Sequence, residues 1–155
     1  MEKVTIENVD GRMSAAAVRR GLSDPLGATD MAINYYELAS GDSFAFGYHA
    51  HVGQEEAFYI QSGTVTFETE NGDVEVESGE VIRFAPGEFQ RGVNRDDERV
   101  VALALGAPRE SELDEMRREC EECDDRTPNT IEMAGNGDEL VTYCLDCGAE
   151  TGRFD

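Results

Sequence analysis

Apolar and polar residues alternate with a period of two along several short segments of the first two thirds of the chain. Side chains of a β-strand point alternately to its two faces, so this alternation is typical of half-buried strands. Glycines and a Pro-Gly pair, which favour turns, stand between the segments. Many short strands at this spacing predict an all-β sandwich or barrel. The expected strands are residues 33–38, 43–51, 56–61, 65–70, 74–77, 80–85 and 99–105, and the one helix candidate before them is residues 14–20.

Asn71-Gly72 stands between two of the alternating segments and predicts a β-hairpin, because both central residues of a type I′ turn adopt positive φ. A loop formed by these two residues would place Phe67 opposite Val76. The apolar side chains of both strands would then share one face, as a buried sheet surface requires.

The only two histidines of the chain, His49 and His51, stand two residues apart in a segment expected to be a strand. Residues i and i+2 of a strand share a face, so both imidazoles can point at one cation. Glu56 follows in the next strand, on its more apolar face, which we expect to point inward. Two imidazoles and one carboxylate form the facial triad of non-haem iron and also suit manganese, nickel, copper or zinc. The alternative is a pair of surface histidines that bind no metal.

This segment resembles the first motif of the cupin superfamily, which runs G-x5-H-x-H-x3,4-E-x6-G. The chain reads HAHVGQEEAFYIQSG, with His49, His51, Glu56 and Gly63 at the family spacing. The opening glycine of the motif is missing, because Ser43 stands at its position.

A second segment resembles the second cupin motif, G-x5-P-x-G-x2-H-x3-N. The chain reads GEVIRFAPGEFQRGVN, with Gly79, Gly87 and Asn94 at the family positions. Ala85 stands at the proline position, and Gln90 stands where the family has a histidine as fourth metal ligand. Two partial motifs in the family order are together much more specific than either one alone.

The resemblance implies a double-stranded β-helix, or jelly-roll, barrel with a mononuclear metal site. One divalent transition metal, iron, manganese, nickel, copper or zinc, would be held by His49, His51 and Glu56. Gln90 would complete or tune the site, because an amide oxygen is a weaker donor than an imidazole toward these metals. A small molecule would be the ligand, and a homodimer is expected because cupins often dimerise.

Cupins include oxygenases, isomerases, epimerases, decarboxylases, storage proteins and ligand-sensing domains, so the resemblance leaves more than one function open. The first is a metal-dependent enzyme of the oxygenase or isomerase type, in which the cation acts on a chelating substrate. The second is a non-catalytic module for ligand sensing or protein interaction. The third is a purely structural barrel whose histidines bind nothing.

Tyr59, Arg83 and Arg91 are candidates for residues that line or rim the pocket and bind substrate. Arg83 alternates with its apolar neighbours Ile82 and Phe84, so it could face the barrel interior and recognise an anionic substrate. The alternative is that the tyrosine is a packing residue and that both arginines are surface counter-charges.

All four cysteines follow the barrel segment, in the pairs Cys120/Cys123 and Cys144/Cys147, with twenty residues between the pairs. Each C-x-x-C pair can place two thiolates on one tight turn, so that all four meet around a zinc ion. The intervening segment is expected to form a hairpin. The arrangement resembles a zinc ribbon with one structural zinc, while disulfides, an iron–sulfur cluster or a redox dithiol are the alternatives.

The segment that joins the two parts begins at Ser111 with a capping-box pattern and carries basic residues towards its end, as a short helix does. We therefore expect a cupin barrel over residues 1–110 with its core at 33–106, a linker or short helix over 111–119, and a zinc-ribbon-like module over 120–155. A module this short falls below the ~40 residues at which a metal or disulfides are usually needed.

The chain carries 34 Asp and Glu against 13 Lys and Arg, which gives a net charge of −21 at pH 7. The acidic residues are dispersed, a composition that resembles halophilic proteins, because concentrated salt screens the repulsion between them. The charge disfavours nucleic acid as a partner, also at the ribbon, since residues 120–155 hold two Arg and ten Asp or Glu. We expect the ribbon to cap the barrel or to dock on a partner protein.

The apolar segments of the chain are far shorter than the ~20 residues that span a bilayer. The first residues, MEKVTIENVD, lack the apolar stretch of a signal peptide. The acidic field also opposes binding to anionic membranes. We therefore expect a soluble, cytoplasmic protein without a membrane partner.

Overall fold

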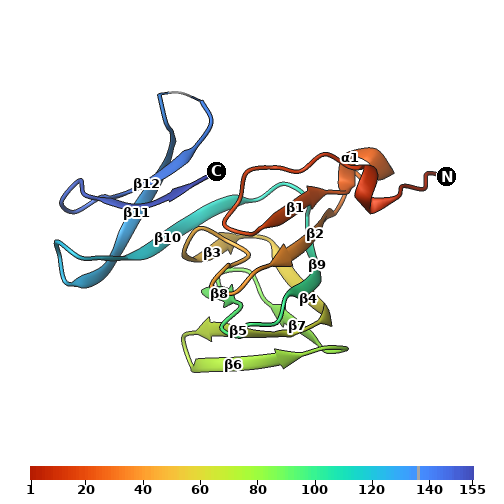
Figure 1. The fold of residues 1–155 in the computed structure, drawn as a ribbon, viewed down its shortest axis with the longest axis horizontal. Coiled ribbons are helices and arrows are strands. Elements are labelled where there is room, and N and C mark those ends of the chain that lie inside the picture. The colour runs from red at the N-terminus through yellow and green to blue at the C-terminus, as the bar shows by residue number, and fades with distance from the viewer. Residues whose placement is uncertain (136) are drawn as a thin grey trace.

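The computed structural model describes residues 1–135 and 137–155, and only the backbone of residues 112–114. It is built almost entirely of strands (Figure 1), and the two helical elements among the described residues are single turns, η1 Ile6–Asn8 and α1 Ser23–Leu26. The strands are β1 Val18–Gly21, β2 Ala32–Leu38, β3 Tyr48–Val52, β4 Glu55–Ser62, β5 Thr64–Thr69, β6 Gly72–Glu77, β7 Val81–Phe84, β8 Gln90–Val93, β9 Val100–Ala107, β10 Glu112–Cys120, β11 Asp125–Met133, β12 Leu140–Cys144 and β13 Glu150–Phe154.

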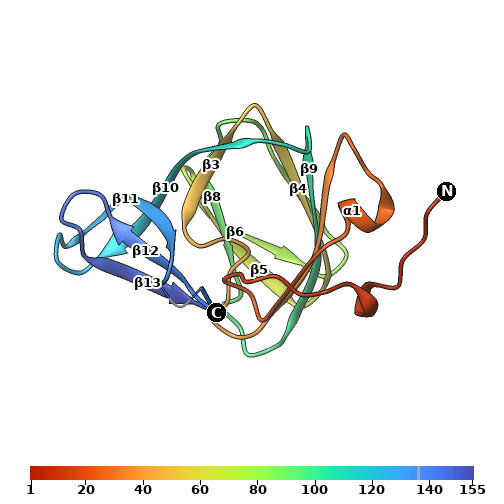
Figure 2. The ribbon, with the colours of Figure 1, turned by 90° about the horizontal axis from the view of Figure 1, so that it is seen from above.

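The strands form two antiparallel sheets that face each other as a jelly-roll barrel. One sheet has the order β1-β2-β9-β4-β7, and the other has the order β13-β12-β11-β10-β3-β8-β5-β6. Figure 2 shows the barrel strands as a ring, with β11, β12 and β13 beside it. The predicted all-β fold, a jelly-roll barrel followed by a small C-terminal module, is confirmed.

Aromatic side chains form the centre of the buried core inside the barrel. The ring centroid of Phe44 lies 4.9 Å from that of Phe58 and 5.9 Å from that of Phe67. Gly92 permits this packing, because a Cβ atom there would lie 2.6 Å from the Phe44 ring and 2.7 Å from the Phe67 ring. The buried aromatic rings supply much of the apolar area that stabilises the barrel.

The expected hairpin is confirmed by β5 and β6, but its expected register is wrong by two residues. Phe67 lies opposite Val74 instead of Val76, because the turn is formed by residues 70–71. The residue with positive φ is Gly72, at 103°, so the turn does not use the predicted type I′ geometry. A shift by two leaves every side chain on its expected face, since the period of a strand is two.

Two helix predictions are wrong. Residues 14–20 were a helix candidate, but β1 begins at Val18 and pairs with β2. The short helix expected over residues 111–119 is instead part of β10, which pairs with β3 on one side and with β11 on the other. In both segments, hydrogen bonding to a distant strand outweighs the local helix signals.

The pattern also missed β8 and set one strand start too early. β8 has four residues, which is too short for a clear alternation of apolar and polar positions. The strand expected to begin at residue 43 begins at Tyr48 in the structure.

β10 runs from the barrel into the C-terminal module without a break. Its residues Glu112 to Arg117 pair with β3, and Arg117 to Cys120 pair with β11. The module is therefore attached to the barrel through a shared strand of one continuous sheet rather than through a flexible tether.

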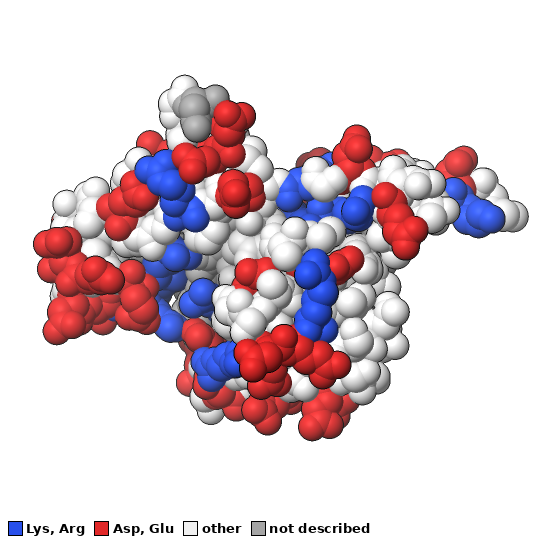
Figure 3. All heavy atoms as spheres, viewed as in Figure 1, with Lys and Arg blue, Asp and Glu red and all other residues white. Residues whose placement is uncertain are grey.

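Acidic side chains lie over both parts of the molecule. Figure 3 shows Asp and Glu on the barrel and on the C-terminal module, with smaller groups of Lys and Arg between them. In the described part of the chain, no helix is long and apolar enough to cross a membrane.

Candidate metal sites and their cavity

The two histidines and Glu56 come together inside the barrel, from strands of its two facing sheets. His49 and His51 lie on β3, with ring centroids 4.9 Å apart, and Glu56 lies on β4. One ligand atom from each of the three side chains lies within 4.8 Å of the other two. The Nε2 atom of His51 is 3.6 Å from a carboxylate oxygen of Glu56. The three side chains can therefore bind one cation together.

His49 is held in the form that binds metals. Its Nδ1 donates a hydrogen bond to the carbonyl oxygen of Gly47 at 3.0 Å, which leaves the lone pair of Nε2 free to point at the site. Burial lowers the pKa of His49 to about 4, so the imidazole is neutral at physiological pH. Burial also raises the pKa of Glu56. A bound cation would favour the ionised carboxylate and offset this effect.

Gln90 lies at the fourth corner of this group. It is opposite His49 in the pairing of β3 with β8, and its Nε2 donates to a carboxylate oxygen of Glu56 at 3.0 Å. The same Nε2 is 3.4 Å from Nε2 of His49. Among the described side chains, Gln90 Oε1 and His51 Nδ1 are buried without a hydrogen-bond partner. Two imidazoles and one carboxylate form a donor set that fits a divalent transition metal, and the unsatisfied Oε1 of Gln90 is a further oxygen donor beside them.

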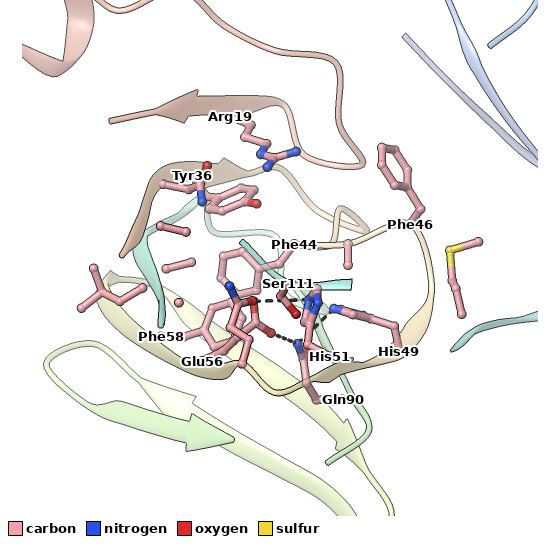
Figure 4. A pocket seen from close by; sticks show the side chains of 18 of the residues that line it. Arg19, Tyr36, Phe44, Phe46, His49, His51, Glu56, Phe58, Gln90 and Ser111 are labelled. Carbon is pink, nitrogen blue, oxygen red and sulfur yellow. Dashed lines mark hydrogen bonds and ion pairs between the residues drawn. The ribbon is translucent and has the colours of Figure 1, made fainter. Parts of the chain in front are cut away.

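A cavity of about 300 Å³ opens from these residues, at the lower end of the range for small-molecule sites. In Figure 4 the side chains of His49, His51, Glu56 and Gln90 converge on one side of it, and Arg19 and Tyr36 lie across from them. Phe44 and Phe58 form part of its apolar wall. The cavity thus joins a polar centre to an apolar wall and a cationic side chain.

The three residues expected to bind substrate do not line this cavity in the described structure. Tyr59 is 38% exposed on β4. Arg83 does not face the barrel interior, because it forms an ion pair of 2.5 Å with the exposed carboxylate of Glu55. Arg91 lines a separate hollow between the barrel and the C-terminal module.

The cavity is lined instead by residues of β1 and β2 that sequence reasoning missed. Asn34 and Tyr36 alternate along β2 and share its inward face, which was a usable signal. Arg19 on β1 gave no such signal, because it lay in a segment expected to be helical.

The four cysteines also form one cluster, at the end of β10 and the turn after it and at the end of β12 and the turn after it. The Sγ atoms of Cys120 and Cys147 are 3.5 Å apart, and those of Cys123 and Cys144 are 3.9 Å apart. All four lie within 4.8 Å of one another and are free cysteines. A tetrahedron with Zn–S bonds of ~2.3 Å has edges of about 3.8 Å, so this spacing fits a small zinc module.

Thr127 supports one thiolate of the cluster. Its hydroxyl is 3.1 Å from Sγ of Cys144. This hydrogen bond is the largest of the causes that lower the pKa of Cys144, to about 6, and a lowered pKa favours the thiolate that binds a metal.

Comparisons with known proteins agree with this geometry. Residues 34–106 match the family model described as Cupin domain. No curated protein matches the chain.

Solved structures share this fold, and two of them share it over nearly the whole chain. One is described as a sugar phosphate isomerase of the cupin superfamily from Silicibacter pomeroyi, with a TM-score of 0.62 and 20% identity, covering 96% of this chain and 91% of that chain. Another is a putative sugar phosphate isomerase from Acidithiobacillus ferrooxidans, with a TM-score of 0.60 and 23% identity, covering 94% and 93%. A predicted oxalate decarboxylase from Thermotoga maritima has a TM-score of 0.59 and 21% identity, covering 68% and 98%. The first two likenesses therefore include most of the C-terminal module as well as the barrel.

Proposed function

Because residues 34–106 of this chain are a cupin domain, we propose that the protein binds one divalent transition metal in its barrel and uses it to hold a small, oxygen-rich molecule. His49, His51 and Glu56 are the proposed ligands, with Gln90 as a weaker fourth. The observation that carries this proposal is the convergence of these three side chains within 4.8 Å of one another on a cavity large enough for a small molecule.

A metal bound there would act as a Lewis acid toward a hydroxyl or carbonyl oxygen of the ligand. The protein's own residues would do the rest of the positioning. Asn34 and Tyr36 would offer hydrogen-bonding groups beside the ligand, and Phe44 and Phe58 would keep water from its apolar side.

We propose an isomerase-type reaction on a sugar phosphate as the first activity to test. Its support is the description of the two structures from Silicibacter pomeroyi and Acidithiobacillus ferrooxidans, which align over nearly the full length of both chains. The small cavity suits one compact substrate better than a polymer.

Ligand binding without turnover is the second candidate, and Gln90 favours it. An amide in place of the family's histidine weakens the metal site, and Glu56 is the only carboxylate among the described residues that line the cavity. If Glu56 holds the metal, no second carboxylate of this lining is left to act as a general base.

The four cysteines are proposed to bind a structural zinc. Four thiolates fill the tetrahedron of a zinc ion and leave no open position for chemistry. The role of this zinc would be to hold together the turns that follow β10 and β12, in a module too small for a large apolar core.

Elemental analysis of the whole chain, purified without a chelator or His-tag, tests the two sites separately. We expect about one zinc and about one further transition metal per chain. The His51→Ala variant should lose the barrel metal and keep the zinc, whereas Cys123→Ser should do the reverse. Glu75→Gln, at an exposed position of β6, serves as the control and should keep both metals. Loss of both metals from either site variant would contradict the two-site proposal.

Nuclear magnetic resonance of the metal-loaded protein with fructose 6-phosphate separates the two candidate functions. Interconversion with an isomeric sugar phosphate that His51→Ala abolishes would support the enzyme. Binding without any conversion would favour the ligand-binding module.

A further inference from the structure

Arg19 differs from most arginines of this acidic chain in having no carboxylate partner. Arginines that form ion pairs with Asp or Glu are Arg12, Arg83, Arg95, Arg99, Arg109, Arg117, Arg126 and Arg153. Two others, Arg20 and Arg118, donate to backbone carbonyl oxygens. Among the hydrogen bonds and ion pairs of the described residues, none involves the guanidinium of Arg19 or that of Arg91. Of these two, Arg19 lines the metal cavity.

The Arg19 side chain packs against Tyr36, but its hydrogen-bond donors are not all satisfied in the described structure. Its strand pairs with β2 so that Arg19 lies opposite Tyr36, and its guanidinium carbon is 5.9 Å from the centroid of the Tyr36 ring. Its Nε is buried and has no hydrogen-bond partner in the described structure. A buried donor without a partner is costly, so such a group is expected to have a partner that the protein does not supply.

The other arginine of the cavity is already engaged. Arg109 donates to the carbonyl oxygen of Ala28 at 2.6 Å and forms an ion pair with Asp24. The Asp24 carboxylate neutralises this guanidinium and holds it against the α1 segment. Of the two arginines that line the cavity, Arg19 is therefore the one available to bind a ligand. It lies across the cavity from His51 and Glu56 (Figure 4).

We propose that Arg19 recognises the anionic group of the cavity's ligand, and that this ligand is a small organic anion with metal-chelating oxygens at its other end. The guanidinium would bind a phosphate monoester or a carboxylate through paired N–H donors, while hydroxyl or carbonyl oxygens reach the metal. The proposal rests on the proposed function and narrows its ligand class. A net charge of −21 repels anions, so binding one requires a dedicated cation inside the cavity.

Isothermal titration calorimetry of the whole, metal-loaded chain tests this assignment. The probes are fructose 6-phosphate for a phosphate, glycerate for a carboxylate, and fructose as the uncharged reference. We expect at least one anion to bind about tenfold or more tightly than fructose, and Arg19→Met to remove this preference. Arg19→Lys should retain part of it, because it keeps the charge but not the paired donors. Arg83→Met, on the outer face of β7, is the matched control and should bind like the wild type.

Two results would overturn the role of Arg19. One is a wild-type protein that shows no preference for either anion over fructose. The other is an Arg19→Met variant that is folded by circular dichroism, keeps its metals and binds the anions as tightly as the wild type. Metal analysis of the same samples distinguishes failure of the role given to Arg19 from failure of the proposed function. A wild-type barrel without metal contradicts the proposed function, whereas a filled site without dependence on Arg19 contradicts only the present proposal.

Discussion

At the scale of single residues, the metal site depends on a glycine that the cupin motif does not contain. Gly47 accepts the hydrogen bond that fixes the tautomer of His49, and it passes close to β10. A Cβ atom at this position would lie 2.6 Å from the carbonyl oxygen of Arg117 and 2.9 Å from Cγ of Met116. Because Gly47 has no side chain, it can lie close enough to β10 for its carbonyl oxygen to accept the hydrogen bond from His49.

Gly47→Ala should shift this segment and weaken barrel-metal binding by about 10–100-fold, as loss of an outer-sphere hydrogen bond to a metal ligand usually does. The overpacking should also lower the free energy of unfolding by about 1–3 kcal/mol. A competition titration with a metal-binding dye measures the first effect, and denaturant unfolding measures the second. Gly11→Ala is the control, because its nearest neighbouring atom would be 3.9 Å from the new Cβ. Unchanged metal affinity in Gly47→Ala would contradict the role given to the carbonyl.

The sequence was sufficient to find the proposed metal ligands and insufficient to find the proposed anion-binding residue. His49, His51 and Glu56 could be found because they are close in the chain and the period of a strand determines which side chains share a face. Gln90 could be found only through the second cupin motif, because no feature other than its position in that motif connects it to the histidines. Arg19 could not be found, because its place depends on the pairing of β1 with β2 and its segment was a helix candidate.

At the scale of elements, β10 shows how tertiary pairing changes a local preference. Its sequence has the capping and charge pattern of a helix, yet Met116 lies opposite His49 in the pairing of β10 with β3. Met116 is only 4% exposed and lines the cavity behind the metal residues. The apolar side chain is buried only if the segment is extended, which favours the strand.

Met116→Ala should lower the free energy of unfolding by about 2–5 kcal/mol, the range for truncating a buried methionine. Met133→Ala on β11 provides a matched control, because Met133 is 54% exposed and the same truncation there should change stability by no more than about 0.5 kcal/mol. Chemical denaturation of both variants gives the comparison. Equal effects at the two positions would mean that β10 does not pack against the barrel as described.

At the scale of the whole molecule, the excess of acidic over basic residues gives a net charge of −21. At least 21 of the 34 acidic residues cannot have a cationic side chain of their own, because there are only 13 Lys and Arg. The Debye length falls from ~10 Å at 0.1 M salt to ~3 Å at 1 M, so concentrated salt removes most of the repulsion between exposed carboxylates. Screening of this charge by salt is therefore expected to stabilise the fold.

The melting temperature should therefore rise by several degrees between 0.1 M and 2 M KCl, since each 1 kcal/mol of relieved repulsion shifts the melting temperature by roughly 2–4 °C in a chain of this size. Differential scanning calorimetry measures the shift. Sucrose at matched osmolality is the control, because it is excluded from protein surfaces but does not screen charge. A melting temperature that is constant or falls with KCl would contradict the electrostatic explanation.

The strand shared by the barrel and the C-terminal module also sets an order of events during synthesis of the chain. β3 carries both histidines, but its pairing with β8 is limited to His49 and Gln90, so most of its backbone partners are in β10. Those partners leave the ribosome more than fifty residues after the histidines do. The strand with the two histidines can therefore reach its final position only after residues 112–117 have been made. A nascent barrel that captured a metal before β10 was made would hold it in an incomplete site, so metal loading is expected to follow synthesis of β10.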